Sequence, residues 1–218
     1  MFQPFSVPDA IRVLMLSAAL LLAGSVVRAQ IGAPDGDDFD RCRREASLPE
    51  ARLKSCSNVI ADTARMSDIR AEAYLNRGAA HEELGLTAKA IEDYSQGLML
   101  NPNYRLLYHR RGLVYGDEGK HDLAIADFSQ AIRLDPKDTE ALAYRGLSYA
   151  GQDQHEKAIL DYDAALAEAP DDPLILAMRG ESREALGHRD AATADFRRAL
   201  ELDAQNELAK DGLERLAR

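Results

Sequence analysis

The sequence predicts an all-α protein in which helix-turn-helix units stack in a row as an α-solenoid, and three observations carry that prediction. The phrase "DLAIADFSQAIRLDP" at residues 122–136 nearly repeats "AKAIEDYSQGLMLNP" at residues 88–102. The same residue types recur every 34 residues, as Gly78 and Gly112 illustrate. Within each period, two stretches of helical composition are separated by a short polar turn. A repeat of this length indicates a small hairpin that buries its apolar side only against a neighbouring hairpin.

The composition fits one folded domain and argues against two classes of partner. The chain has 218 residues, of which 46% are apolar and 29% charged, so it carries enough apolar material for a core. Its formal net charge is -10. Nonspecific binding to nucleic acid or to anionic lipid needs surplus Lys and Arg, so we expect neither as a partner.

The first element, residues 1–29, has the pattern of a secretory signal peptide. Arg12 precedes an apolar run from Val13 to Val27, and Ala29 ends a small-residue cleavage site. The apolar run is short for a membrane-spanning helix, which needs about 20 apolar residues. We therefore expect cleavage, a flexible mature N-terminus at residues 30–37 and no stable membrane insertion. An uncleaved N-terminal anchor is the alternative.

The second element, residues 38–66, contains both cysteines of the chain. A helix containing Phe39 to Ala46 and a second helix, opened by Ser47 and Glu50 at capping-box spacing, would form an antiparallel pair. Cys42 and Cys56 would then lie level with each other. In an oxidising compartment they would form a disulfide that stabilises the pair by about 3 kcal/mol. Two free, buried thiols are the alternative.

Four later units share aligned columns. The columns are a glycine (Gly78, Gly112, Gly146, Gly180), an alanine (Ala90, Ala124, Ala158, Ala192), an aromatic residue (Tyr94, Phe128, Tyr162, Phe196) and a small residue (Gly97, Ala131, Ala165, Ala199). Each unit divides into two helices, such as Glu140 to Gln152 and Glu156 to Glu168. Proline ends the second helix in the first three units, at Pro102, Pro136 and Pro170.

The glycines predict close packing inside each unit. A glycine within a helix costs about 1 kcal/mol relative to alanine, so four in matched places need a compensating contact. We expect the glycine of each first helix to face the alanine of each second helix, with Gly78 against Ala90 as the first pair. The aromatic column would fill the wider space toward the next unit.

These columns resemble the tetratricopeptide repeat family, whose motif places a large residue, Gly, aromatic, Ala, aromatic, Ala and Pro at these intervals. The resemblance covers residues 71–206 as four units, with the boundaries 71–104, 105–138, 139–172 and 173–206. It implies a right-handed α-solenoid. His81 and Arg183 depart from the motif where Tyr115 and Tyr149 fit it, and Ala204 replaces the last proline.

The two ends of the chain read as caps. "ARLKSCSNVI", residues 51–60, overlays "KAIEDYSQGL", which places Cys56 in the aromatic column but leaves the Gly and Ala columns unfilled. Its spacing to the first unit predicts an extended connection from Asp62 to Ile69. At the other end, residues 207–218 predict a helix that shields the apolar side of the last unit.

A second pair of columns is charged. Arginine precedes each glycine and aspartate precedes each aromatic residue, as in Arg77 and Asp93, Arg111 and Asp127, Arg145 and Asp161, and Arg179 and Asp195. We expect a ladder of bidentate ion pairs between first and second helices. A solvated charged stripe is the alternative. Either arrangement removes these aspartates from the candidates for catalysis.

No enzymatic motif is complete. "GLSYA", residues 146–150, lacks the second glycine of a nucleophile elbow and lies within a predicted helix, so Ser148 reads as structural. "VYGDEGKH", residues 114–121, lacks the first glycine and the hydroxyl of a P-loop and reads as an interhelix turn. The five histidines never show the spacing of a helical zinc pair. We expect no enzyme, no cofactor and no metal site.

The resemblance implies a groove lined by the first helices, which holds an extended peptide or a helix. The residues it implies are Asn76, His109, Arg110, Leu113, Tyr144, Leu147 and Met178. Only Asn76 and Arg110 match the carboxylate clamp of chaperone-binding members, so a mixed groove for an apolar or helical segment is expected. The alternative is that several of these residues only pack between repeats.

Together these patterns predict an exported adaptor that binds a protein or peptide. Its expected location is the periplasm or cell envelope of a Gram-negative bacterium. A permanent structural subunit of an envelope or secretion assembly is the competing interpretation.

Overall fold

The computed structural model describes residues 37–44 and 48–217, and these form eleven helices without a strand. The predicted signal peptide at residues 1–29, its anchor alternative and nearly all of the segment 30–37 lie outside the described residues. The helices are α1 (Asp38–Arg43), α2 (Pro49–Ala61), α3 (Ser67–Glu83), α4 (Thr87–Leu100), α5 (Arg105–Asp117), α6 (His121–Leu134), α7 (Thr139–Ala150), α8 (His155–Glu168), α9 (Pro173–Ala185), α10 (Arg189–Leu202) and α11 (Glu207–Leu216). None of the described helices is long and apolar enough to cross a membrane.

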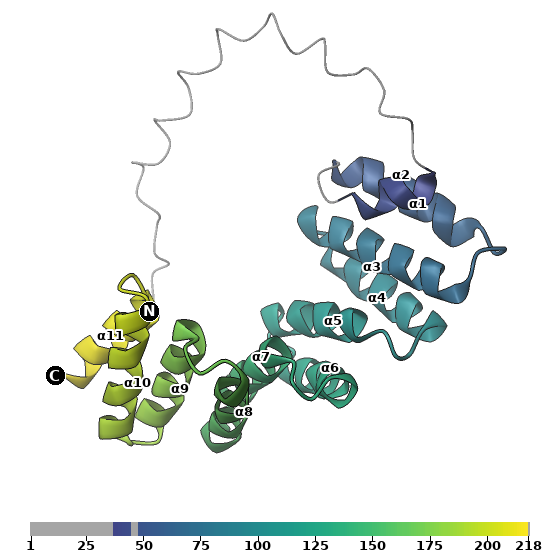
Figure 1. Cartoon of the computed structure of the whole chain (residues 1–218). Coiled ribbons are helices and arrows are strands. Elements are labelled where there is room, and N and C mark those ends of the chain that lie inside the picture. The colour runs from purple at the N-terminus through teal and green to yellow at the C-terminus, as the bar shows by residue number, and fades with distance from the viewer. Residues whose placement is uncertain (1–36, 45–47, 218) are drawn as a thin grey trace, which may run out of the picture. The chain divides into compact units, whose positions relative to one another are not determined.

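The helices form a helical-repeat solenoid (Figure 1). Each contacts the one that follows it in the chain, and α5 and α9 both contact α7. The paired helices α3–α4, α5–α6, α7–α8 and α9–α10 are the four predicted hairpins. First helices therefore neighbour first helices, which places their exposed sides next to one another.

The residue nearest to each of the four aligned glycines is the aromatic residue of its own unit, which corrects the expectation that the aromatic column only fills the space toward the next unit. A Cβ on Gly78 would lie 2.4 Å from Cε1 of Tyr94, and one on Gly146 would lie 2.8 Å from Cε1 of Tyr162. Gly112 and Gly180 meet their own aromatic residues in the same way. The ring of each second helix thus packs against the glycine of its own unit's first helix, where a larger residue would crowd it.

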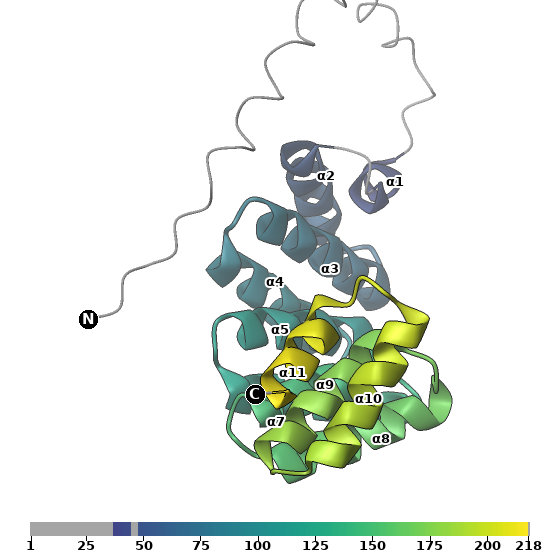
Figure 2. The same cartoon turned by 90° about the vertical axis from the view of Figure 1, so that its left-hand side faces the viewer.

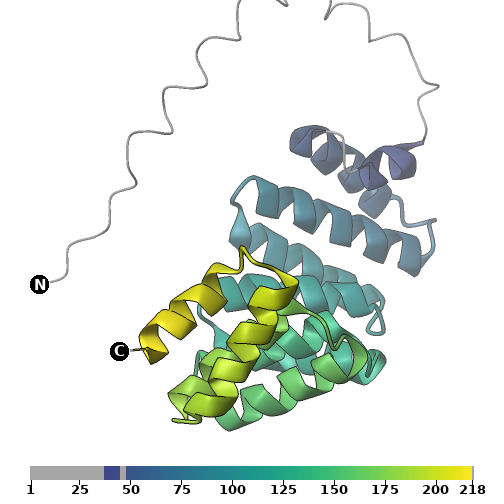
Figure 3. The same cartoon turned by 60° about the vertical axis from the view of Figure 1, so that its left-hand side comes forward.

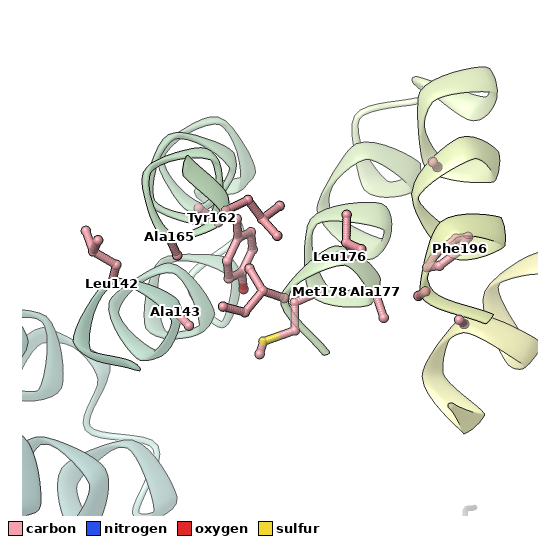
Figure 4. Close-up of a cluster of buried hydrophobic side chains, with 14 residues drawn as sticks. Leu142, Ala143, Tyr162, Ala165, Leu176, Ala177, Met178 and Phe196 are labelled. Carbon is pink, nitrogen blue, oxygen red and sulfur yellow. The ribbon is translucent and has the colours of Figure 1, made fainter. Parts of the chain in front are cut away.

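The largest buried cluster joins α7, α8, α9, α10 and α11 and contains the small and aromatic columns of two units (Figure 4). The aligned alanines are fully buried there, and Tyr162 is 1% exposed. Both columns are therefore part of a core that is shared by neighbouring units.

The N-terminal helices α1 and α2 lie next to each other (Figure 3). The Cys42–Cys56 disulfide joins them, and both cysteines are fully buried. α1 ends at Arg43, short of the expected Ala46, which lies outside the described residues. Leu48 is the N-cap residue of α2 and makes no side-chain cap, while Pro49 takes the first helical position. Ser47 of the expected capping box also lies outside the described residues.

The expected extended connection from Asp62 to Ile69 is wrong at its C-terminal end. α2 ends at Ala61 and α3 already begins at Ser67, so only the residues between them form the turn. α3 begins 11 residues before Gly78, whereas α5 begins 7 residues before Gly112, so the longer spacing to the first unit lengthens α3 at its N-terminus. Asp37, in contrast, is ordered as the N-cap of α1, where its carboxylate accepts hydrogen bonds from the backbone N–H groups of Phe39 and Asp40.

At the other end, α11 lies beside α9 and α10 (Figure 2). Its Gly212 approaches the ring of Phe196, and a Cβ there would lie 2.4 Å from the Cζ atom of that ring. Phe196 therefore has a glycine of α9 on one side and a glycine of α11 on another. Leu208, Leu213 and Leu216 pack against the same buried cluster.

Candidate functional site

The Arg–Asp ladder fixes the first helices of all four units, and its prediction is confirmed. In the second unit, Arg111 donates from Nε and Nη2 to the two carboxylate oxygens of Asp127, both at 2.7 Å. The other three pairs are also bidentate. The aspartates are 3% to 6% exposed. Hydrogen bonds to Asp127 raise the pKa of Arg111.

Each ladder arginine also reaches the preceding unit. Nη1 of Arg111 donates to Ser95 Oγ at 2.8 Å, and Nη1 of Arg77 donates to Ser57 Oγ at 3.1 Å. Ser57 follows Cys56 just as Ser95 follows Tyr94. The register predicted for the N-terminal unit therefore agrees with the contacts, and one guanidinium joins three helices at each junction.

Contacts with the ladder aspartates explain why His81 and Arg183, in the two outer units, depart from the aromatic motif. His81 Nδ1 lies 2.9 Å from Asp93 Oδ2, and Arg183 Nη1 donates to Asp195 Oδ2 at 2.7 Å. Both side chains occupy the position of Tyr115 and Tyr149 in the inner units. The aspartates of the outer units thus have a second nitrogen partner, whereas those of the inner units have the ladder arginine.

Three adjoining cavities run along the side formed by α3, α5 and α7, and we call them together the groove. The polar cavity, about 410 Å³, is lined by Arg52, Leu75, Asn76, Ala79, Glu82, Glu83, Leu106 and Arg110. The central cavity, about 270 Å³, is lined by Leu106, His109, Arg110, Leu113, Glu140 and Tyr144. The apolar cavity, about 220 Å³, is lined mainly by Leu113, Phe128, Tyr144, Leu147 and several glycines. Shared residues make the three continuous.

At the polar end, charged groups line the cavity beside aliphatic ones. Glu82 Oε1 accepts a hydrogen bond from the Tyr94 hydroxyl, and burial raises the pKa of Glu82. Asn76 donates its amide to the backbone oxygen of Glu72 at 3.0 Å. Arg110 is exposed and makes no hydrogen bond or ion pair with any residue that the structure describes. Of the two arginines that line this cavity, it is therefore the more accessible to a partner.

In the central cavity, His109 is a buried residue that packs against aromatic side chains. It is 6% exposed and meets the rings of Phe128 and Tyr144 edge-on at centroid distances of 5.8 and 6.0 Å. Burial lowers the pKa of His109, which keeps the imidazole neutral near pH 7. Its Nε2 lies 3.8 Å from the carboxylate of Glu140.

At the apolar end, aromatic stacking shapes the wall. The rings of Phe128 and Tyr144 stack at 5.9 Å with an interplanar angle of 17°. Leu147 is 47% exposed at the edge of this cavity. A volume of about 220 Å³ with such a lining has room for one apolar side chain of a partner.

Six of the seven residues implied by the resemblance line the groove, and one does not. Asn76, His109, Arg110, Leu113, Tyr144 and Leu147 each line at least one of the three cavities. Met178 is 7% exposed and belongs to the buried cluster of Figure 4. It packs between repeats, which is the alternative left open for this set.

Arg52 and Leu106 are groove residues that the sequence did not single out. Leu106 lines both the polar and the central cavity. Arg52 comes from α2 and stands in the alanine column. A charged residue at a position that is otherwise small and buried is the feature of the sequence that could have identified it as a groove residue.

The two incomplete catalytic motifs lie where the sequence predicts. Ser148 Oγ donates to the backbone oxygen of Tyr144 within α7, at 2.8 Å, so its hydroxyl is used inside the helix. The P-loop-like phrase spans the turn between α5 and α6, where Gly119 has a φ of 69°.

Comparisons with known proteins agree with this geometry. Family profiles described as tetratricopeptide repeat match residues 71–104, 109–173 and 175–206. The comparison with curated protein sequences gives no match.

Solved structures give the same fold. MamA from Desulfovibrio magneticus RS-1 is 23% identical, with a TM-score of 0.68 over 79% of this chain and 98% of that one. YrrB, described as a TPR protein with an unusual peptide-binding site, is 19% identical, with a TM-score of 0.67 over 76% and 84%. The first TPR domain of Spaghetti (RPAP3), bound to an HSP90 peptide, is 26% identical, with a TM-score of 0.51 over 52% and 90%. With three profile matches inside the repeat array and this fold, the chain belongs to the tetratricopeptide repeat family.

Proposed function

We propose that this protein is a non-catalytic interaction scaffold whose groove binds a peptide or helical segment of a partner protein. The single observation that carries the proposal is the continuity of the three cavities along α3, α5 and α7. A groove that changes from charged to apolar along its length suits a segment with both kinds of side chain.

The rigidity of the groove supports this role. Its walls come mainly from first helices. Each ladder arginine ties its first helix both to the second helix of the same unit and to the preceding unit, as Arg111 does. A surface that is already in place loses little conformational entropy when a partner binds. Two of the structural relatives are described with peptide or a peptide-binding site, which favours the same use of the fold here.

The scaffold would act outside the cytoplasm, in the periplasm or cell envelope. The buried Cys42–Cys56 disulfide is suited to an oxidising compartment, and the N-terminal sequence has the pattern of a signal peptide. In a Gram-negative host, the full chain should mature to a form that begins at Gln30, which N-terminal sequencing of the periplasmic fraction would show. A mature chain that keeps Met1 in the membrane fraction would support the anchored alternative.

The test of groove binding compares two exposed leucines on different helices. Leu147 lies at the apolar cavity on α7, whereas Leu160 is 69% exposed on α8 and lines none of the three cavities. Partners captured from envelope extract should be lost by at least tenfold with Leu147→Glu and retained with Leu160→Glu. Because both changes put a charge at an exposed leucine, unequal folding is not expected.

The opposite result would favour the rival interpretation. A permanent structural subunit held through its second helices would lose its partner with Leu160→Glu and keep it with Leu147→Glu. It would also co-purify at fixed stoichiometry, whereas an adaptor would be recovered mostly as free protein.

A further inference from the structure

His109 stands where the other three repeats carry apolar residues, at Leu75, Ala143 and Ala177. It is 6% exposed and lines the central cavity of the groove. A neutral imidazole has one donor and one acceptor, and burying either without a partner costs free energy. The surroundings of its two nitrogens therefore indicate what this cavity can bind.

Neither nitrogen of His109 has a hydrogen bond to a described residue. Nδ1 is sealed from solvent and lies 4.0 Å from Oδ2 of Asp138, whereas Nε2 faces Oε2 of Glu140 at 3.8 Å. Both distances are too long for a hydrogen bond. Asp138 is buried and its charge is poorly screened, whereas Glu140 is exposed, so the proton of the neutral ring belongs on Nδ1. Nε2 then carries a lone pair.

Glu140 supplies the second acceptor of the central cavity. Its side chain is 76% exposed and has no ion pair with a Lys or Arg among the described residues. Burial lowers the pKa of His109, so the neutral ring does not balance this carboxylate near pH 7. Arg110 also lines the cavity, but it acts on Glu82 as well: burial raises the pKa of Glu82, and the charge of Arg110 opposes that rise. Two neighbouring acceptors therefore share no donor.

We propose that the central cavity binds the ammonium group of a lysine side chain of the partner, between Glu140 and Nε2 of His109. The inference rests on the proposed use of the groove and names one side chain that the groove recognises. Two acceptors 3.8 Å apart converge on one point, which suits a compact ammonium with three donors. A guanidinium presents a planar fork that matches the two oxygens of a single carboxylate instead.

The cavity also fits the rest of a lysine side chain. Its volume is about 270 Å³, and Leu106, Leu113 and Tyr144 contribute apolar walls. Such walls can cover the four-carbon stem while the ammonium stays at the polar groups. Leu113 and Tyr144 line the apolar cavity as well. The partner would therefore carry an apolar side chain next to its lysine.

The charge of the protein favours the same partner. Asp117 lines the adjoining apolar cavity, is exposed and has no ion pair with any residue that the structure describes. The formal net charge of the chain is -10. Attraction over this range speeds the encounter with a cationic segment and repels an acidic one. The groove is therefore complementary to a basic, amphipathic segment.

The experiment follows the imidazole nitrogen-15 signals of His109 by NMR in the whole mature protein near neutral pH. The free protein should show the tautomer that is protonated on Nδ1. The probe is acetyl-lysyl-alanyl-leucinamide, and its control carries an acetyl group on the lysine nitrogen, which removes the charge and keeps the stem. The lysyl probe should shift the Nε2 signal saturably, and the acetylated control should bind about tenfold more weakly.

Three results would overturn the proposal. They are equal binding of the two probes, an Nε2 signal that the lysyl probe does not shift, and a free tautomer protonated on Nε2. In the last case Nε2 is itself a donor that a small rotation would bring to Glu140, and no donor from a partner is needed.

The matched variants are Glu140→Gln and Glu156→Gln. Each replaces an exposed glutamate at the second position of its helix, α7 or α8, so both lose the same interaction with a helix N-terminus. Of the two, only Glu140 lines a cavity of the groove. Glu140→Gln should weaken binding of the lysyl probe about tenfold, and Glu156→Gln should leave it unchanged. Equal affinities in the two variants would show that Glu140 serves only the start of α7.

The outcome is separable from that of the groove function. If the lysine subsite fails while Leu147→Glu still abolishes partner capture, the groove function stands without it. If Leu147→Glu leaves partner capture unchanged, the groove function itself fails, whatever the lysyl probe does.

Discussion

The N-terminal unit and the four repeats solve the same packing problem with different chemistry. In each repeat an aromatic ring lies on a glycine and a bidentate Arg–Asp pair joins the two helices. In the N-terminal unit Cys56 takes the place of the aromatic residue and a disulfide joins α1 to α2. Ser57 nevertheless accepts from Arg77 as Ser95 accepts from Arg111. The N-terminal unit and the repeats therefore share the arginine contact that joins one unit to the next, whereas the cores inside the units differ.

The largest expected effect tests the ladder that only the repeats possess. Arg145→Ala leaves the buried Asp161 without its bidentate partner and should cost about 3–5 kcal/mol of unfolding free energy, measured by urea denaturation. Arg77→Ala is the matched change in an outer unit, where the third acceptor is again a serine and Asp93 keeps its contact with His81 Nδ1. It should cost clearly less, and equal costs would show that the second nitrogen partner contributes nothing.

The next effect tests the bond that only the N-terminal unit possesses. Replacing Cys42 and Cys56 together by alanine should cost about 3 kcal/mol, because a disulfide across this short loop restricts the unfolded chain. Hydrogen exchange should show faster opening confined to α1 and α2. Equal loss of protection in α7 to α10 would mean that the unit is integrated with the whole array and is not a separate cap.

The smallest effect tests the glycine contact. Gly146→Ala puts a methyl group against the buried Tyr162 ring, and after the gain in helix propensity it should cost about 1–2 kcal/mol. Gly116→Ala is the control, since a Cβ there meets no atom within 4 Å, and it should stabilise α5 by about 0.5–1 kcal/mol. Thermal unfolding of the two variants should shift in opposite directions.

The repeat period explains why the ladder was predictable and the glycine partner was not. Columns such as Arg111 and Asp127 carry opposite charge and identical spacing, so their pairing follows from the sequence. Gly, Ala and aromatic columns are all apolar or small, and their order along the chain does not say which two touch. The structure assigns the contact at Gly78 to Tyr94.

The groove shows a similar limit. The family resemblance implied that Tyr144, Leu147 and Met178 line the groove, but Met178 is buried by its neighbours. Side-chain length and the packing of the adjacent helix decide that difference, and neither is visible in the period. Arg52 lines the groove from the alanine column of an otherwise degenerate unit, where the repeat pattern gives no reason to expect a groove residue.

The third contact of each ladder arginine makes the array cooperative across its junctions. At three junctions the acceptor is a serine hydroxyl, whereas at the last one Arg179 donates to the carboxylate of Asp163 at 2.6 Å. A chain shortened hairpin by hairpin from its N-terminus would strip one acceptor from the next guanidinium at every step. Nearest-neighbour coupling of this kind lets a local disturbance propagate along the row of hairpins.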